Sequence, residues 1–121
     1  MLSDTLLSTG MVEKLAIILN DSQLKQLVSF LSAYRSGMWL YPGALKRKIG
    51  LTTALTYEAL REIASHRLIN GYYELCCSSC QKSTGQVFET INKLPETFYC
   101  ELCHNELPSM ENAVLIYKVM S

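Results

Sequence analysis

The sequence has no excess of charge of either sign and no long apolar run. Eleven basic side chains balance eleven acidic ones over 121 residues, so the chain lacks the overall basic composition that is typical of nucleic-acid-binding proteins. Charged residues interrupt every apolar run before it reaches the ~20 residues that span a bilayer. No basic segment followed by an apolar one opens the chain, so we expect no secretory signal. These absences predict an intracellular, cytoplasmic protein without a membrane partner.

The sequence also has few residues suited to catalysis. It contains only two histidines, His66 and His104, and no Ser/His/Asp set or phosphate-binding glycine loop can be assembled around them. His66 has an ordinary role at the C-terminus of a helix, where the helix dipole favours its protonated form. The sequence therefore predicts a protein that is not an enzyme.

Four of the five cysteines form two Cys-x-x-Cys pairs, the most specific pattern in the chain. Nineteen residues separate Cys77-Ser-Ser-Cys80 from Cys100-Glu-Leu-Cys103. A tight turn within each pair lets both sulfurs reach one ion, and two such turns face to face complete a tetrahedron of thiolates with Zn–S distances near 2.3 Å. The spacing predicts one structural Zn²⁺ ion bound by Cys77, Cys80, Cys100 and Cys103.

Other uses of these cysteines fit the sequence less well. Disulfides are rare in a reducing compartment, and a thioredoxin-like pair would begin a helix, whereas both pairs here lie among extended residues. Four thiolates leave no open position for water, which disfavours catalytic zinc. Cys76 would point to the opposite face of the strand from Cys77. His104 directly follows Cys103 and is also left outside the ligand set.

Apolar side chains recur at helical spacing in much of the chain before the cysteines. The expected helices cover about residues 9–20, 22–36, 42–49 and 53–66, and a short extended segment, residues 38–41, precedes the third. Asp21 and Ser22 offer capping groups for the second helix. Pro42 suits the first turn of the third helix and Gly50 its end. A threonine is the expected N-cap of the fourth helix.

Two segments that flank the cysteine pairs predict β-strands. Residues 68–75 are aromatic and β-prone and lead straight into the first pair, and residues 113–120 form the clearest strand pattern in the chain. We expect residues 72–75 and 114–119 to pair as antiparallel strands, with the metal site closing the hairpin.

The order of these elements is the order found in a winged helix-turn-helix domain. We therefore expect an α+β fold with three parts: an N-terminal helix (residues 1–20), a winged helix-turn-helix domain (residues 21–75), and a four-cysteine zinc ribbon with a C-terminal strand (residues 76–121). The ribbon would extend the wing. It is too small to bury a core of its own, so its folding should depend on the metal.

The charges are unevenly distributed along the chain. Residues 41–71 have a net charge of +3 and residues 72–121 a net charge of −3. In a winged helix, the helix at residues 53–66 would enter a DNA major groove, and the basic cluster before it would contact phosphates. The candidate nucleic-acid-binding residues are Lys46, Arg47, Lys48, Thr52, Thr53, Thr56, Tyr57 and Arg61. Against DNA, Glu58 and Glu62 would repel phosphate wherever they face a duplex, and three consecutive basic residues are also common on a solvated helix face.

The helical segment and the Cys77/Cys80/Cys100/Cys103 pattern together resemble winged-helix and zinc-ribbon proteins such as archaeal transcription factor E and related bacterial regulators and adaptors. The chain departs from the common ribbon turn, Cys-Pro-x-Cys-Gly, at Ser78 and Gln81, and neither cysteine pair is followed by glycine. The resemblance implies a role in assembly on nucleic-acid machinery as much as in reading a DNA sequence.

Two functional hypotheses follow from these patterns. The first is a non-enzymatic, zinc-binding winged-helix protein that acts as a DNA-associated regulator or assembly subunit. The alternative is an adaptor that binds only proteins, which the acidic charge of the ribbon favours. A protein partner is expected under both hypotheses, and DNA only under the first.

Overall fold

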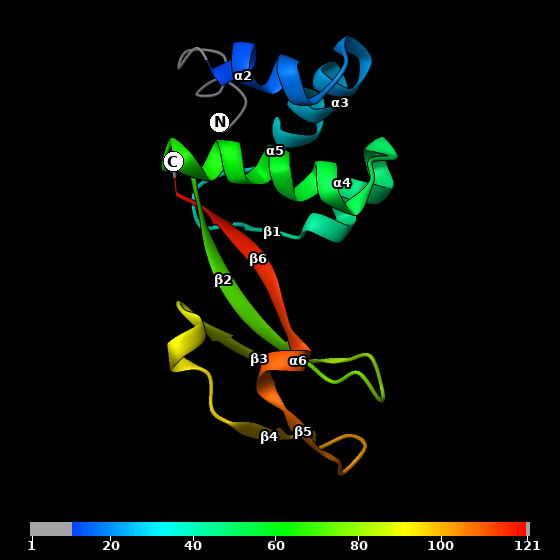
Figure 1. Cartoon of the computed structure of the whole chain (residues 1–121), viewed down its shortest axis with the longest axis vertical. Helices are drawn as coiled ribbons and strands as arrows, with labels where there is room; N and C mark the ends of the chain where they lie inside the picture. The colour runs from blue at the N-terminus through cyan, green and yellow to red at the C-terminus, as the bar shows by residue number, and fades with distance from the viewer. Residues whose placement is uncertain (1–10, 121) are drawn as a thin grey trace. The chain divides into compact units, whose positions relative to one another are not determined.

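The structure is a computed structural model and describes residues 11–120 (Figure 1). Helices come first in the chain and strands follow, so the predicted α+β fold is confirmed. The elements are α2 (Met11–Ile18), α3 (Asp21–Leu31), β1 (Trp39–Leu40), α4 (Pro42–Ile49), α5 (Thr53–Ser65), β2 (Ile69–Cys76), β3 (Ser83–Phe88), the 3-10 turn η1 (Ile91–Lys93), β4 (Thr97–Tyr99), β5 (Glu106–Pro108), α6 (Ser109–Asn112) and β6 (Ala113–Val119). Residues 9 and 10, where the first helix was expected to start, lie outside the described residues.

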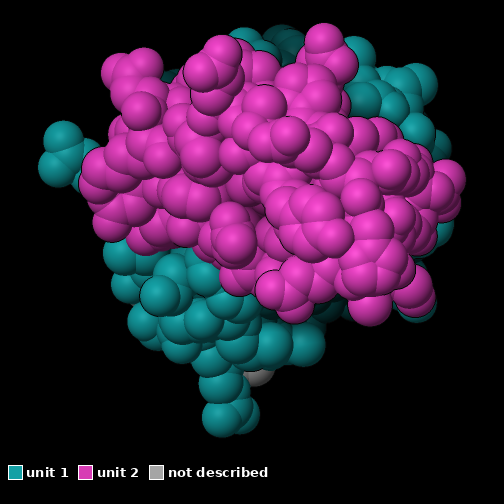
Figure 2. All heavy atoms as spheres, turned by 90° about the horizontal axis from the view of Figure 1, so that it is seen from below, with its two compact units in different colours: residues 1–70, 117–121 teal, residues 71–116 magenta. Residues whose placement is uncertain are grey.

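The chain divides into two compact units, which Figure 2 shows in different colours. Unit 1 comprises residues 1–70 and 117–121, and unit 2 comprises residues 71–116. The two boundaries fall inside β2 and β6, so the same two strands belong in part to each unit. No helix in the described part of the chain is long and apolar enough to cross a membrane.

Helices α2 to α5 supply most of the apolar core of unit 1. Their fully buried side chains include Met11, Leu15, Leu27, Leu31, Leu45, Leu60 and Ile63. Both α2 and α4 pack against α5, and α3 packs against α2 and α4. Burial of a leucine-sized side chain contributes about 2 kcal/mol, so the apolar stripes read from the sequence account for the assembly of these four helices.

The second helix, α3, differs from its prediction at both ends. Its N-cap is Asn20, whose side-chain oxygen accepts a hydrogen bond from the Gln23 amide at 2.8 Å, while the Gln23 side chain accepts from the Asn20 amide at 3.0 Å. This capping box replaces the caps expected from Asp21 and Ser22. The helix ends at Leu31 rather than near residue 36, because the chain turns through residues 32–37.

The turn between α4 and α5 forms as its sequence predicts. Gly50 ends α4 with a left-handed backbone (φ +77), and its amide donates to the Lys46 carbonyl at 2.8 Å. Glycine adopts this conformation without the steric cost that other residues incur. Thr52 then caps α5, and its hydroxyl accepts from the Leu55 amide at 3.1 Å.

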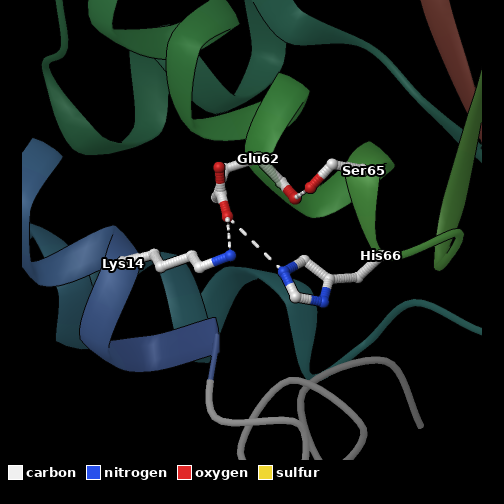
Figure 3. A network of polar contacts seen from close by, with 4 residues as sticks. All are labelled: Lys14, Glu62, Ser65 and His66. Atoms are coloured by element: carbon white, nitrogen blue, oxygen red, sulfur yellow. Dashed lines mark hydrogen bonds and ion pairs between the residues drawn. The ribbon is translucent and has the colours of Figure 1, made fainter.

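A polar cluster joins α2 to α5 within unit 1 (Figure 3). The Lys14 ammonium lies 3.7 Å from one carboxylate oxygen of Glu62, and the His66 Nε2 atom lies 3.4 Å from the same oxygen. The Ser65 hydroxyl donates to the Glu62 carbonyl at 2.6 Å. The Glu62 carboxylate, which was considered as a source of phosphate repulsion, is therefore close to Lys14 and His66 of its own unit.

Four strands form one sheet in the order β1-β6-β2-β3. The expected pairing of the segments at 72–75 and 114–119 is confirmed by the neighbouring positions of β2 and β6. The Met120 amide donates to the Leu68 carbonyl at 2.9 Å, so the end of β6 meets the start of β2 and the pair is antiparallel. The sequence did not predict that β1 would pair with β6, or β3 with β2.

A second, two-stranded sheet lies within unit 2. β4 and β5 pair antiparallel, with Phe98 opposite Leu107 and Tyr99 opposite Glu106. These two three-residue strands flank the second cysteine pair, and Phe98 is buried. They were not predicted, because three residues are too few to display the alternating pattern of a strand.

Candidate metal centre

The first cysteine pair lies in a tight turn between β2 and β3. The Gln81 amide donates to the Cys77 carbonyl at 2.7 Å, and the Cys77 amide donates to the Lys82 carbonyl at 2.9 Å. The turn requires a left-handed backbone at Gln81 (φ +58), directly after Cys80. Cys77 and Cys80 are thereby brought to the same side of the turn.

The second pair repeats this geometry between β4 and β5. The His104 amide donates to the Cys100 carbonyl at 2.8 Å, and the Cys100 amide donates to the Asn105 carbonyl at 2.9 Å. His104 is left-handed as well (φ +61). The usual glycine is absent from this position in both turns, yet both turns form, so the departure from the common ribbon sequence changes the side chain and not the backbone.

The structure brings the four predicted cysteines together. Their sulfur atoms all lie within 4.8 Å of one another. The Cys77 and Cys103 sulfurs are 3.4 Å apart, and the Cys80 and Cys100 sulfurs are 3.6 Å apart. Each short distance therefore joins one cysteine of the first turn to one of the second, and the predicted four-cysteine cluster is confirmed.

These distances fit a tetrahedral zinc site. Four sulfurs at about 2.3 Å from a central ion are separated from one another by about 3.8 Å, close to the observed 3.4 and 3.6 Å. All the cysteines are free thiols, so no disulfide competes for these sulfurs. The cluster is consistent with a structural zinc ion held by four thiolates, which leave no position for a reactive water.

One cysteine of each turn is buried and the other is partly exposed. Cys77 and Cys100, the first of each pair, are 0% and 3% exposed, while Cys80 and Cys103 are intermediate. The Asn105 side-chain amide donates to the Cys103 sulfur at 3.6 Å. Polar groups that hold a ligand sulfur in this way orient it and favour its thiolate form.

The thiols of the cluster differ in their readiness to ionise. Hydrogen bonds from backbone amides, first that of Cys80, lower the pKa of Cys77 to about 6. Burial, together with the neighbouring Cys100 sulfur, raises the pKa of Cys80 to about 12. The Asn105 backbone amide favours the Cys103 thiolate, but the Cys77 sulfur and burial outweigh it and raise the pKa of Cys103. Crowded thiolates repel one another, so full ionisation of this cluster requires a cation.

The two neighbouring groups excluded from the ligand set lie outside the cluster. The Cys76 thiol lies 3.6 Å from the Glu74 carboxylate, and burial followed by this carboxylate raises its pKa to about 11. The His104 Nδ1 atom lies 2.7 Å from the Tyr99 hydroxyl. The ring of His104 is therefore engaged with Tyr99.

Two asparagines support the turns, and the sequence analysis did not single them out. The Asn112 side chain accepts from the Ser78 amide at 3.2 Å and donates to the Pro108 carbonyl at 2.7 Å. It thus connects the first cysteine turn to the chain that follows β5. Asn105 acts on the second turn, as described above. A lone asparagine carries no spacing signal, so nothing in the sequence marks these positions.

Four of the eight candidate nucleic-acid-binding residues lie around one pocket between α4 and α5 in unit 1. This pocket, of about 210 Å³, is lined by Lys46, Thr53, Thr56 and Tyr57 together with Pro42 and Gly43. The Lys46 ammonium donates to the Thr53 hydroxyl at 2.8 Å. A cation is therefore held at the first residue of α5, next to its N-terminal amides.

The threonine hydroxyls and the other basic candidates have different surroundings. Thr52 caps α5, and the buried Thr56 hydroxyl donates to the Thr52 carbonyl at 2.8 Å, so both hydroxyls are used inside the protein. Lys48 lines a separate groove with α3. Arg47 and Arg61 are exposed. Consecutive residues of a helix are rotated by about 100°, so the three basic residues of α4 point in different directions.

Comparison with known proteins gives no relative. No protein-family model matches the chain, and neither a curated protein nor a solved structure matches it. The function of the chain is therefore inferred from its fold and from the residues that the fold brings together.

Proposed function

We propose that this chain is a zinc-stabilised winged-helix protein whose ribbon extends the wing, and that it acts as a DNA-associated regulator or assembly subunit without enzymatic activity. The order α3, β1, α4, α5 and β2 supports the winged helix, since a short strand and a tight turn separate the helices as in that fold. In this reading α5 is the recognition helix and the four thiolates hold the ion that fixes the ribbon.

The contact between Lys46 and the start of α5 carries the DNA part of the proposal. Its ammonium lies 2.8 Å from the Thr53 hydroxyl, at the end of α5 that a winged helix directs towards DNA. Helix N-termini attract phosphate, and a neighbouring lysine adds a full positive charge. The net charge of unit 1 is also positive, because its sequence contains nine basic and five acidic residues.

A titration of the zinc-loaded protein with duplex and single-stranded DNA at low salt tests this proposal. We expect binding that weakens with salt, with each lost phosphate contact reducing the slope of log K against log salt by about 0.9. Lys46→Gln should show this reduction. The matched control is Lys25→Gln, which removes the same charge from an exposed position on α3. No affinity for any duplex or single strand, or equal effects of the two variants, would contradict the DNA role.

The acidity of unit 2 favours the alternative, an adaptor that binds only proteins. Its sequence contains six glutamates and two lysines, which give a net charge of −4. This negative charge repels a phosphate backbone. In this case the protein would co-purify with a protein partner, and reversal of ribbon glutamates to lysine would abolish the association without affecting zinc content.

A further inference from the structure

A groove in unit 2 lies beside the second cysteine turn, and Cys100 is the one metal ligand among the residues that line it. Its volume is about 250 Å³. One wall comes from β3 and the residue before it, and the other wall comes from the second turn and the residue that leads into it. The lining residues are Lys82, Ser83, Thr84 and Gln86 on the first wall and Tyr99, Cys100, Glu101 and Leu102 on the second.

The second wall presents two large apolar side chains to solvent. Leu102 is 68% exposed and Tyr99 is 56% exposed. Leu102 lies between Cys100 and Cys103, so its backbone is held by the hydrogen bonds of the turn and, with the ion bound, by both flanking thiolates. A rigid apolar side chain in this position loses little entropy on binding a partner, which makes it an effective anchor.

The first wall comes from the last strand of the four-stranded sheet, β3. A bulge at Gly85 (φ +78) interrupts it, where the Gly85 amide donates to the Ser83 hydroxyl and the Gln86 amide to the Thr84 hydroxyl. Because these amides already have partners, an incoming chain cannot add here as a regular strand. A side chain at Gly85 would meet no atom within 4 Å. This space is open to a peptide segment that the side chains of the groove, and not strand pairing, would recognise.

Three polar side chains of the groove are uncommitted. Within residues 11–120, no group bonds to the Lys82 ammonium, the Gln86 side-chain amide or the Glu101 carboxylate. The first two donate hydrogen bonds of the kind that peptide carbonyls accept, and the third accepts from a cationic side chain. Together they match an extended peptide that carries a lysine or arginine.

The charge of the whole unit agrees with such a ligand. Unit 2 has a net charge of −4 from its glutamates and lysines, and a zinc ion with four thiolates adds two more negative charges. We propose that this groove binds an extended, basic segment of a partner protein, with an apolar side chain against Leu102 and Tyr99 and a neighbouring lysine or arginine beside Glu101. This inference rests on the zinc-bound ribbon of the proposed function and is independent of DNA binding.

A synthetic nine-residue peptide with alternating lysine and leucine is the probe. It is titrated into the zinc-loaded full chain, with amide chemical-shift mapping and fluorescence anisotropy as readouts. We expect shifts concentrated at residues 82–86 and 99–102. Leu102→Ser and Glu101→Lys should each weaken binding at least tenfold. Glu89→Lys changes the net charge as much as Glu101→Lys at an exposed position outside the groove, and it should weaken binding less than threefold.

Several results would overturn the inference. Equal weakening by Glu89→Lys and Glu101→Lys would indicate general electrostatic attraction. Shifts elsewhere, no binding, or equal binding of a glutamate-leucine peptide would exclude a basic segment as the ligand of this groove. A single-stranded oligonucleotide that shifts the same residues more strongly would identify a different ligand. Zinc content is measured for every variant. A wild-type chain without zinc would contradict the proposed function. A zinc-loaded chain that does not bind the peptide would contradict only this inference.

Discussion

Removal of the ion should unfold unit 2 and leave unit 1 folded. The perturbation is Cys100→Ser, which replaces a thiolate ligand at a position only 3% exposed. Among residues 11–120, fifteen of the twenty buried apolar side chains belong to unit 1 and five to unit 2, and two of those five are Cys77 and Cys100 themselves. Three remaining apolar side chains contribute about 6 kcal/mol at about 2 kcal/mol each, whereas zinc binding to such sites supplies on the order of 10 kcal/mol. Unit 2 therefore depends on the metal far more than unit 1.

Amide hydrogen exchange and metal analysis test this prediction together. In Cys100→Ser, or in the wild-type chain treated with a chelator, amides at residues 71–116 should lose protection, including the part of β6 within unit 2. Amides of α3, α4 and α5 should keep theirs. Cys76→Ser is the matched control, because Cys76 lies one residue from the cluster, and it should retain one zinc per chain. A Cys100→Ser chain that keeps one zinc and melts unchanged would refute the assignment of the site.

Two further predictions concern the same cluster. Zinc affinity should fall about 100-fold or more for each pH unit lost between pH 8 and 6.5. The pKa of Cys80 is raised to about 12 and that of Cys103 is also raised, so both thiols hold a proton throughout this range and each must release it when zinc binds. Competition against a chromophoric chelator over this pH range measures the slope, and an affinity independent of pH would contradict it. Gln81→Gly should stabilise the zinc-loaded protein by about 0.5–1 kcal/mol, since it relieves a left-handed non-glycine backbone. His104→Gly should gain less stability, because it also loses the 2.7 Å contact with Tyr99. Thermal melting of the two zinc-loaded variants compares these gains. A loss of stability in Gln81→Gly would contradict the prediction.

The features that could be predicted from the sequence are those with local signals. Pro42 and Gly50 mark the two ends of α4 because each residue restricts or permits a particular backbone conformation. The cysteine spacing predicted the cluster because a two-residue interval fixes the turn within each pair. The left-handed backbones at Gln81 and His104 follow from the same turn, although neither residue suggests them.

The features that could not be predicted depend on partners distant in the chain. β3 begins Ser-Thr-Gly-Gln and has no alternating pattern, so only its pairing with β2 makes it a strand. The end of α3 was predicted too late because Tyr34 continues the apolar stripe beyond the helix, where its ring contacts Phe30. The basic cluster of α4 counted as one patch in the sequence, yet Lys46 contacts α5 while Lys48 lines a groove with α3.

The charge of unit 2 and its shape depend on the metal to different degrees. With the ion bound by four thiolates, the unit has a formal charge of −6, and its glutamates and lysines alone contribute −4 of this charge. Most of the negative charge therefore does not depend on the metal, so attraction of a basic partner would persist in the metal-free chain. The position of Leu102 is different, because the turn that carries it is closed by two of the four ligands. A basic peptide should therefore still associate weakly with the metal-free chain, while the contribution of its apolar side chain, measured as the tenfold effect of Leu102→Ser, should disappear.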